Sequence, residues 1–445
     1  MRPERIAGAS ALIVCAALLA APWRGHVDDF DAQIHTVVAR NLARDHSWVG
    51  LRYLPSFDPV FRDHLPFGFW PAAAAIRAAG EWATAPLYAL MMLGAIAVSG
   101  AIAHRVGGAW AGVAAILLLG TCESIWQYGG RLLLEPPLLL FATAAAGAAL
   151  AGRWAVAAVL GAVAMLIKGP FGLLPLLSAA IVRWRDRRGV LAVLAAIVPL
   201  ALFLAVDPGG GWRDGYLHDQ LLASASGARG GGVGAWWFPL AVVVRRFWPG
   251  FPFLIVALWQ ARRNAPIRPL LYTCALVLAA LCLPERKWGN HSYVVFPLLG
   301  AVAGVAASAL LERTSDRAKA AVAAALAVVA VAVSASGLGT LVLRPPCPFS
   351  TVLADALRRV PAETPLVVVA GDRATAAAAA VALAAERDLV PSLETSLSSR
   401  SNSRLALIHR SVNLEPPWHP LADGGGWTLA ERAADLTGTP SNGVP

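Results

Sequence analysis

The sequence predicts an all-α polytopic membrane protein with about 11 transmembrane helices, followed by a small C-terminal α/β domain. Two observations carry this prediction. The 445 residues are 57% hydrophobic and only 14% charged, with a mean hydropathy of +0.60, whereas a soluble domain needs more charge to cover its surface. The apolar residues also come in blocks of roughly 15–22, the length at which a helix crosses a bilayer.

The apolar blocks place the predicted spans. The first block follows Arg2 and Arg5 and has the outline of a secretion signal. It contains no convincing cleavage site and many spans follow it, so we interpret it as a retained first helix. The predicted spans are 7–22, 84–103, 109–126, 132–151, 154–167, 170–182, 189–206, 247–260, 268–284, 291–311 and 320–343. Eleven spans put the two termini on opposite sides of the membrane.

The loops between the spans indicate the orientation. With the N-terminus in the cytoplasm, every inside loop is short and nearly all are basic, as the positive-inside rule requires. These loops are 104–105, 152–153, 183–188, 262–263 and 312–319. Such an arrangement accounts for much of the net charge of +10, so a nucleic-acid partner is not expected.

Two large outer loops and a tail remain. The loops cover about 23–83 and 207–246. The first contains amphipathic stretches at 31–44 and 66–80, which are expected to lie along the membrane surface.

The change in composition at the start of the tail predicts the boundary between two domains. We expect a transmembrane domain at 1–343 and an extracytoplasmic α/β domain at 344–445. Within the tail, 366–370 and 405–409 have the pattern of buried strands, and 374–387 that of an alanine-rich helix.

Basic residues on the outer side need an explanation other than orientation, because a desolvated cation at a helix end is costly unless an anion or a water-filled cavity receives it. About half of them are explained by contacts with lipid headgroups, which the long Lys and Arg side chains can reach from a helix end. The other half indicate a phosphate or pyrophosphate site, where Arg offers forked hydrogen bonds and Lys a compact charge. The set is Arg40, Arg44, Arg52, Arg62, Arg131, Lys168, Arg213, Arg229, Arg245, Arg246, Arg286 and Lys287.

Acidic residues gather at the same face. Taken singly, each is better explained as a solvated loop residue or a helix cap. Their clustering with the cations favours a site, because a carboxylate opposite a phosphate can act as a general base or hold a metal ion. The acids are Asp28, Asp29, Asp31, Asp45, Asp58, Asp63 and Glu135.

The order of these residues resembles that in the polyprenyl-phosphate-sugar glycosyltransferases of the GT-C superfamily, above all the bacterial group with the lipid A aminoarabinose transferase and the protein O-mannosyltransferase relatives. In that family the first outer loop opens with an acid on a juxtamembrane helix, then an Arg and a Trp. Asp31, Arg40 and Trp48 have that spacing. Ala32 and His35 stand where a second acid and an aromatic residue are usual.

Three further motifs follow in order. The segment 63–70 is similar to the end of the family's loop, with His64 where Lys is usual, which weakens a phosphate contact there or makes it pH-dependent, since His titrates near neutrality. Glu135 after Arg131 resembles the family's acidic site at the head of a span. Lys168 and the glycine after it resemble a Lys-Gly turn between two spans.

Two later segments complete the resemblance. The residues 216–220 and 247–249 are similar to the second outer loop and the helix after it. Lys287 before Tyr293 and Pro297 is similar to the Lys and Tyr–Pro signature at the carrier-binding face. The tail resembles the family's small extracytoplasmic α/β domain.

The resemblance implies an inverting transfer of a sugar from a polyprenyl-phosphate carrier, at the outer face of a bacterial inner membrane. Lys168, Arg131, Lys287 and His64 would stabilise the charge that grows on the leaving lipid phosphate. Tyr293 would belong to the carrier-binding face.

The acids would supply the base. Asp31 is the expected base for the attacking group, and Asp63 and Glu135 are further catalytic candidates. Asp31 and Asp63 are also the candidates for a divalent cation, since family members differ in their need for one. The residues alone favour its absence, because so few carboxylates without tight spacing make a poor metal site.

The sugar and the acceptor stay open: lipid A, another glycolipid, a polysaccharide and a protein side chain all fit. A transporter or flippase for a lipid-linked anion would use the same cations, but it predicts charges in the middle of spans and an internal repeat, and neither is evident. A scaffold that has lost catalysis is compatible with Ala32, His35 and His64.

Overall fold

The structure is a computed structural model, and it describes residues 3–20, 30–45, 47–53, 60–228, 233–248, 250–263, 265–312, 314–336, 360, 366–369, 379, 383, 392–394, 405–409, 418–424 and 427–432. The chain divides into two compact units. The membrane unit consists of Met1–Gly25, Leu42–Leu51 and Phe61–Arg344, and the sheet unit consists of His26–Asn41, Arg52–Val60 and Pro345–Pro445.

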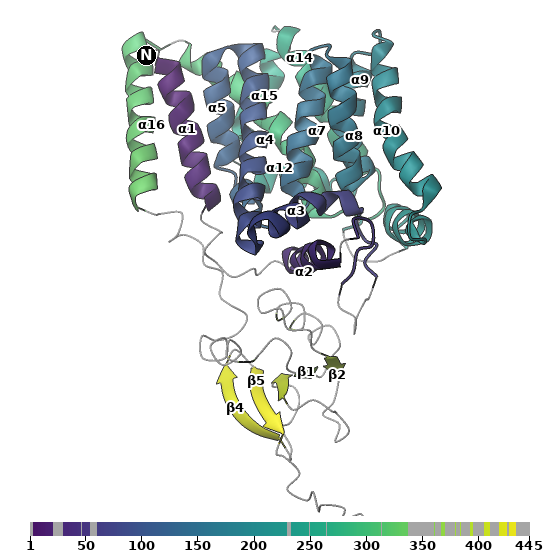
Figure 1. Cartoon of the computed structure of the whole chain (residues 1–445). Coiled ribbons are helices and arrows are strands. Elements are labelled where there is room, and N and C mark those ends of the chain that lie inside the picture. The colour runs from purple at the N-terminus through teal and green to yellow at the C-terminus, as the bar shows by residue number, and fades with distance from the viewer. Residues whose placement is uncertain are drawn as a thin grey trace, which may run out of the picture. The chain divides into compact units, whose positions relative to one another are not determined.

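The membrane unit is built from helices (Figure 1). Its α-helices are α1 (Pro3–Ala20), α3 (Trp70–Ala79), α4 (Thr84–Gly107), α5 (Ala109–Gly120), α6 (Glu123–Gly129), α7 (Glu135–Leu150), α8 (Trp154–Lys168), α9 (Pro170–Val182), α10 (Arg188–Val206), α11 (Ala223–Ala225), α12 (Phe238–Arg246), α13 (Phe251–Gln260), α14 (Arg268–Cys282), α15 (Phe296–Leu311) and α16 (Asp316–Ser336). The 3₁₀ helices are η2 (Pro66–Gly68), η3 (Glu81–Ala83), η5 (Ala265–Ile267) and η6 (Gly289–Val295), and η4 (Arg213–Leu222) is a π-helix. Helix α2 (Phe30–Asp45) begins in the sheet unit, and its last residues belong to the membrane unit.

Several of these helices can cross a membrane by length and composition. Among the described residues, four segments qualify, and a fifth is added if α12 and α13, which are bent by 110°, count as one. The four are Glu81–Gly107, Arg188–Val206, Ala265–Cys282 and Gly289–Leu311. The apolar helices α5, α7, α8 and α9 are shorter, at 10–17 residues. The polytopic helical class is therefore confirmed, and the number of eleven spans stays a prediction.

Two predicted spans contain a break between helices. The span expected at 109–126 stops at Gly120, and a second helix, α6, follows. Gly120 packs directly on the side chain of Cys15 in α1, a contact that leaves no room for a larger residue. The span expected at 247–260 begins only at Phe251, after the bend from α12.

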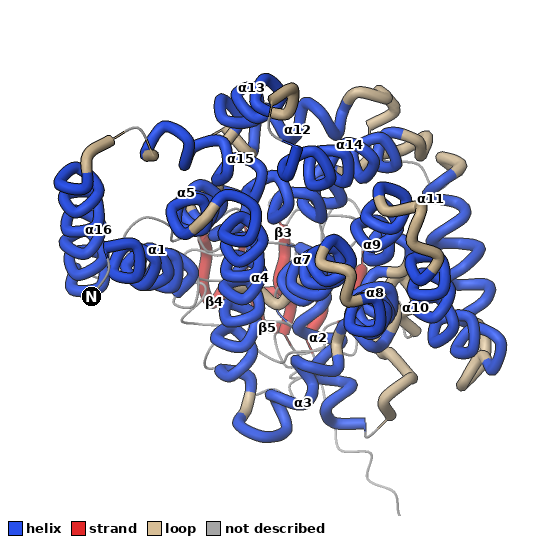
Figure 2. The backbone as a smooth tube through the Cα atoms, turned by 90° about the horizontal axis from the view of Figure 1, so that it is seen from above, coloured by secondary structure: helices blue, strands red, loops and turns tan. Residues whose placement is uncertain are grey.

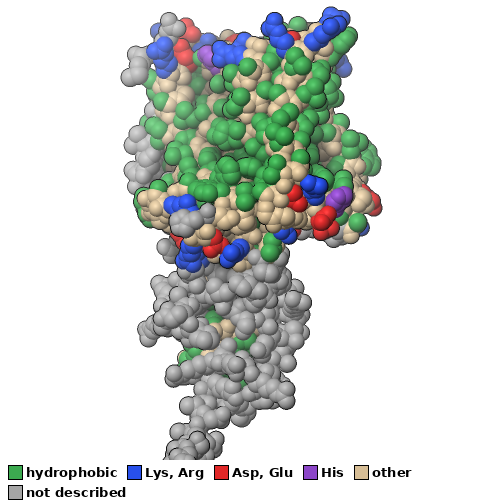
Figure 3. All heavy atoms as spheres, turned by 45° about the vertical axis from the view of Figure 1, so that its right-hand side comes forward, with side chains coloured by type: hydrophobic (Ala, Val, Ile, Leu, Met, Phe, Trp, Pro, Cys, Tyr) green, Lys and Arg blue, Asp and Glu red, His purple; other side chains and the backbone are tan. Residues whose placement is uncertain are grey.

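Short connections make consecutive helices run in opposite directions (Figure 1). Gly108 joins α4 to α5, residues 151–153 join α7 to α8, and Gly169 joins α8 to α9. The turns 151–153 and 183–187 thus lie at one end of the bundle, which we call the basic end. Gly169 lies at the other, which we call the cavity end after the cavity described below. Figure 3 shows an apolar band between two zones of charged side chains.

Small residues let the central helices approach closely, as is usual in membrane bundles. A Cβ atom on Gly112 of α5 would lie 2.9 Å from the carbonyl oxygen of Gly100 in α4. A Cβ atom on Gly304 of α15 would lie 2.5 Å from the carbonyl oxygen of Ala111. Seen from above in Figure 2, α1 and α16 form one flank of this bundle and α10 lies at the opposite flank.

Helix α3 lies across the cavity end of the vertical helices (Figure 1). Two side chains attach it to the segment before it: the Arg77 Nε atom donates to the carbonyl oxygen of Ala43 at 2.7 Å, and the Trp70 Nε1 atom donates to that of Trp48 at 2.7 Å. The Arg77 guanidinium also lies 4.9 Å from the centre of the Trp48 ring. The predicted amphipathic stretch 66–80 thus forms η2 and α3; its place at a membrane surface stays a prediction.

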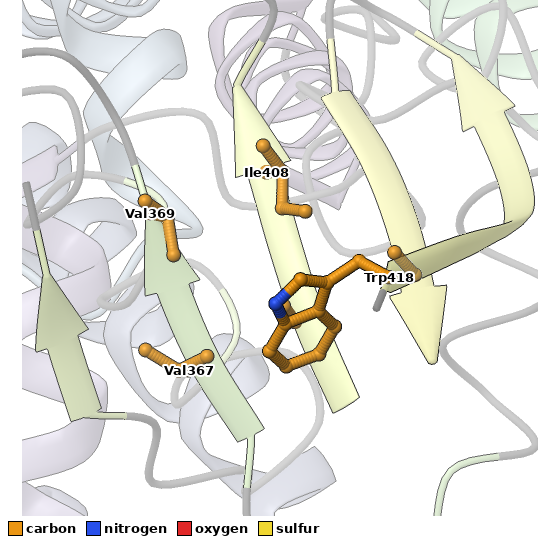
Figure 4. Packing of buried hydrophobic residues seen from close by; sticks show 6 residues of the cluster. Val367, Val369, Ile408 and Trp418 are labelled. Carbon is orange, nitrogen blue, oxygen red and sulfur yellow. The ribbon is translucent and has the colours of Figure 1, made fainter. Parts of the chain in front are cut away.

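The sheet unit contains a mixed sheet. Its strands are β1 (Leu366–Val369), β2 (Ser392–Glu394), β3 (Leu405–His409), β4 (Trp418–Gly424) and β5 (Trp427–Arg432), in the order β2-β1-β3-β5-β4. Strand β1 pairs in parallel with β2 and β3, while β5 pairs antiparallel with β3 and β4. On one face, Val367, Val369, Ile408 and Trp418 pack together with Ala406 and Ala430 (Figure 4).

The two predicted strands of the tail are confirmed as β1 and β3. Of the predicted helix at 374–387, the structure describes Ala379 and Leu383, which are helical and buried; the rest lies outside the described residues. The hairpin of β4 and β5 was not predicted.

Candidate functional site

A cavity of about 330 Å³ opens at the cavity end of the membrane unit. Its wall is mostly apolar, with a few polar and charged side chains, the composition that small-molecule sites usually have. The lining residues are Asp63, His64, Lys168, Pro170, Phe171, Leu174, Tyr216, Gln220, Leu221, Ser224, Ala225, Ala280, Pro284, Arg286, Trp288 and His291. Three of the residues predicted from sequence, Asp63, His64 and Lys168, are therefore brought together.

A tight turn places Lys168. Helix α8 ends at Lys168, Gly169 follows with φ of 57°, and α9 begins at Pro170. Positive φ favours glycine, and a side chain on Gly169 would collide with the hydroxyl group of Tyr216. A Cβ atom on Gly172 would likewise collide with the backbone of Ala164 in α8. The predicted Lys-Gly turn therefore has a steric reason: only glycine fits between the two helices and η4.

Lys168 forms a buried ion pair with Glu135. The Lys168 Nζ atom lies 2.5 Å from the Glu135 Oε1 atom, and the two side chains are 8% and 5% exposed. Glu135 is in the first turn of α7, where the helix dipole also favours a negative charge. A buried lysine is stable in this position because its charge is matched. Glu135 thus joins the site through Lys168.

The segment that contains Asp63 and His64 is hydrogen-bonded to both large outer loops through the two residues that precede Asp63. The amide of Phe61 donates to the carbonyl oxygen of Leu51 at 3.1 Å, and the Arg62 Nη2 atom donates to that of Gly210 at 2.5 Å. The Phe61 ring lies 6.0 Å from the His64 ring. These contacts hold the acid and the histidine where the first large loop meets the second.

The π-helix η4 forms another part of the wall. Tyr216, Gln220 and Leu221 all line the cavity from this helix. Burial raises the pKa of the Tyr216 hydroxyl above its ordinary value, so this group stays neutral. Short π-helical segments are often found at functional sites. The turn before η4 is closed by Asp207, whose carboxylate accepts from the amides of Gly211 and Trp212 at 3.0 and 2.7 Å.

The loop 284–288 contributes Arg286 to the lining. Lys287, its neighbour and the predicted phosphate ligand, is buried, and its Nζ atom donates to the carbonyl oxygens of Pro284 at 2.6 Å and Gly234 at 3.4 Å. Sequence reasoning counted Arg286 among the outer cations but did not choose it for the site. The signal for it was present, since it is a basic residue beside a span on the outer side.

Three other predicted residues are not part of this lining in the described part of the chain. Tyr293 is buried in η6, with its ring 5.4 Å from that of Tyr128 and 5.1 Å from that of Phe296. Arg131 is half-buried in the turn before α7. Asp31 is exposed on α2, in the sheet unit, so its relation to the cavity stays a prediction.

A metal site does not emerge among the described residues, which contain no group of three or more His, Cys, Asp or Glu side chains placed to hold an ion. Asp31 and Asp63, the predicted pair, belong to different units. The divalent cation therefore stays a prediction, as does its coordination by Asp31 and Asp63.

Comparison with known proteins shows the fold. The chain is similar to ArnT from Cupriavidus metallidurans bound to undecaprenyl phosphate, with a TM-score of 0.70 and 16% identity over 97% of this chain and 98% of that one. It is also similar to the apo state of that ArnT, with a TM-score of 0.64 and 17% identity over 93% of this chain and 95% of that one. The Archaeoglobus fulgidus oligosaccharyltransferase in complex with Zn and sulfate matches only with a TM-score of 0.49 and 14% identity, over 90% of this chain and 68% of that one, which is too weak for an argument.

No model of a known family matches the sequence, and no curated protein sequence does. The likeness to ArnT covers nearly the whole of both chains. The chain therefore shares the fold of ArnT, as the resemblance in the sequence led us to expect.

Proposed function

We propose that this protein transfers a sugar from a polyprenyl-phosphate carrier to an acceptor at the outer face of a bacterial inner membrane, with inversion at the anomeric carbon. The observation that carries the proposal is the cavity, which places Asp63, His64, Lys168 and Arg286 in a mostly apolar wall at one end of the bundle. A ligand with an anionic head and a lipid tail fits such a wall. The fold supports it, since its ArnT neighbour was solved bound to undecaprenyl phosphate.

In this reaction an acceptor oxygen or nitrogen attacks the anomeric carbon, and the bond from that carbon to the phosphate oxygen breaks. The electron pair stays on the phosphate, so negative charge grows there. Cations in a cavity with little water stabilise that charge strongly. Lys168 is the proposed cation from α8 and His64 the proposed one from the first loop. Arg131, Lys287 and Tyr293, predicted for the carrier, remain secondary candidates outside the cavity lining.

The acceptor's proton needs a base. Asp31 is the proposed base, as the resemblance implies, and Asp63 is the carboxylate that the cavity itself offers. Glu135 is better suited to a positioning role, because its contact with Lys168 fixes the ammonium and offsets its charge. An arriving phosphate would then share that ammonium with Glu135.

The decisive experiment compares acid variants of the full chain in proteoliposomes that contain a polyprenyl-phosphate sugar. We expect Asp31→Asn to reduce sugar transfer by about 100-fold or more, which corresponds to the loss of a general base, while carrier binding is retained. Asp214→Asn is the matched control, because Asp214 is an exposed acid on η4 and should transfer at the wild-type rate.

Two outcomes would count against the proposal. Full transfer by Asp31→Asn removes Asp31 from the mechanism. Movement of the labelled carrier across the bilayer by the wild-type protein, without any transfer of sugar to membrane lipids, glycans or proteins, would support a flippase instead.

A further inference from the structure

The most informative group in the cavity is the guanidinium of Arg286. Its Nε atom is buried and has no hydrogen-bond partner among the described residues. A buried donor without a partner costs free energy, and for a charged group the cost is higher. Arg286 nevertheless lines a cavity, where a ligand can reach it. Such a group is satisfied when an anion enters.

Gln220 provides a second, independent indication. Its Oε1 atom is also buried without a partner among the described residues, and it lines the same cavity. Native proteins pair most of their buried polar atoms. The Arg286 Nε atom needs an acceptor and the Gln220 Oε1 atom needs a donor, so together they mark a place for a ligand that carries both.

Lys287 is bound quite differently. Its backbone pairs with Val233 as an antiparallel bridge, with N–H···O distances of 3.1 and 2.9 Å. Its ammonium donates to the carbonyl oxygens of Pro284 and Gly234. The amide of Glu285 donates to the carbonyl oxygen of Ala225 at 3.1 Å. These contacts fasten the loop 284–288 to the segment that follows η4, and both lie beside the cavity.

We propose that Arg286, and not Lys287, is the residue of this loop that binds the phosphate of the ligand, and that Lys287 is a positioning residue that holds Arg286 in place. These two roles explain why two adjacent cations occur here. Lys287 donates to backbone carbonyls within the fold, and Arg286 keeps a donor available for an anion. An Arg suits the second task because its fork matches phosphate oxygens. The proposal rests on the proposed function for the source of the phosphate, which is a lipid-borne ester.

The test measures binding of undecaprenyl phosphate to the full-length protein in nanodiscs, with undecaprenol as the uncharged comparison. We expect Arg286→Gln to raise the Kd by about tenfold or more, as the loss of a charge-assisted contact does, and Arg286→Lys to recover part of it. Arg213→Gln is the matched control. Arg213 is at the same end of the bundle, but its guanidinium already donates to the carbonyl oxygens of Leu204 and Ala205 at 2.9 and 2.7 Å, so its Kd should stay within about twofold.

Lys287 is tested by hydrogen exchange as well as by binding. We expect Lys287→Met to speed exchange of the Val233 and Lys287 amides and to weaken binding in step, and Lys287→Arg to restore both. Weak binding by Lys287→Met with amides that exchange as slowly as in the wild type would overturn the proposal, because Lys287 would then contact the ligand directly. Wild-type affinity in Arg286→Gln would overturn it too.

A chemical readout separates this inference from the proposed function. Phenylglyoxal modification of Arg286, followed by mass spectrometry, should be slowed by inorganic pyrophosphate and by undecaprenyl phosphate. Protection by pyrophosphate without any binding of undecaprenyl phosphate supports the anion site and contradicts the lipid carrier. Binding and transfer of the lipid-linked sugar with Arg286 unprotected supports the proposed function and contradicts the role of Arg286.

Discussion

The basic end and the cavity end of the bundle use their cations in different ways. At the basic end, the Arg183 Nη1 atom donates to the carbonyl oxygen of Leu150 at 2.7 Å, and the Arg268 Nε atom donates to that of Ala261 at 2.7 Å. Both arginines satisfy carbonyl groups that a helix leaves open where it ends. At the cavity end, Lys168 pairs with a buried carboxylate and Arg286 keeps a buried donor unmatched among the described residues.

This contrast separates cations that stabilise the fold from cations that can bind a ligand. Position at the cavity end is not sufficient, because Arg213 and Lys287 are at that end and donate to backbone carbonyls. The useful criterion is a cation that lines a cavity and whose donors the fold does not use up.

The largest effect is expected at the ion pair of the cavity end. Glu135→Ala leaves the Lys168 ammonium buried without its carboxylate, which costs about 3–5 kcal/mol and should abolish transfer. The measurement is denaturant unfolding in bicelles together with a transfer assay. The double variant Glu135→Leu, Lys168→Met should recover most of the stability and none of the transfer. A single variant as stable as the wild type would contradict the burial of the pair.

The next effect concerns the turn beside that pair. Gly169→Ala combines positive φ with a collision against Tyr216, so a loss of about 3 kcal/mol or more is expected. Gly209→Ala is the matched control. Gly209 also has positive φ, at 79°, but an added Cβ there meets no described atom within 4 Å, so only about 1 kcal/mol should be lost. Equal losses in the two variants would show that Tyr216 does not restrict the turn.

The basic end should respond in stability alone. Arg183→Gln removes the hydrogen bonds to the end of α7, for an expected loss of about 1–2 kcal/mol. Sugar transfer per folded molecule should stay within about twofold of the wild type. If transfer fell much more than the amount of folded protein, the cations of the basic end would also affect the reaction, which contradicts the difference between the two ends.

The smallest effect is a pH dependence at the basic end. The Trp154 indole donates to the Asp186 carboxylate at 2.5 Å, and this hydrogen bond, with the Arg188 amide and nearby arginines, lowers the pKa of Asp186. Because the folded pKa lies below the unfolded one, the stabilisation is present above the ordinary carboxyl range and disappears as the pH falls through the folded pKa. The thermal midpoints of the wild type and Asp186→Asn should therefore differ at neutral pH and converge as the pH falls below the ordinary carboxyl range. A constant difference would exclude this linkage.

Much of the site could be predicted from sequence, because acids and cations at span ends on the outer side are rare enough to be noticed. That reasoning named Asp63, His64 and Lys168, which share the cavity, and Glu135, which contacts Lys168. It could not pair Glu135 with Lys168, since the two are on neighbouring helices and no short spacing relates them. Sequence reasoning could not choose Arg286 over Lys287 either. The backbone bridge between Lys287 and Val233 determines which of the two side chains faces the cavity, and this bridge joins residues that are far apart in the sequence.

The fold shows a similar limit in the sheet unit. The glycines after β4 are a hairpin signal, but Pro420 argues against a strand, since proline cannot donate to a ladder. The structure accommodates Pro420 because β4 is at the edge of the sheet and its register shifts between Pro420 and Ala422. Such an irregularity depends on the partner strand and not on local sequence.

The contact between α7 and α8 has a consequence for how this protein can diverge. Neither Glu135 nor Lys168 can be exchanged alone without stranding the other inside the bundle, so the two positions should covary among homologues. A lineage that loses one should soon lose both, and with them the contact that we propose for the lipid phosphate. A neutral pair at these two positions would then be a genetic marker of relatives that keep the scaffold and have abandoned the reaction.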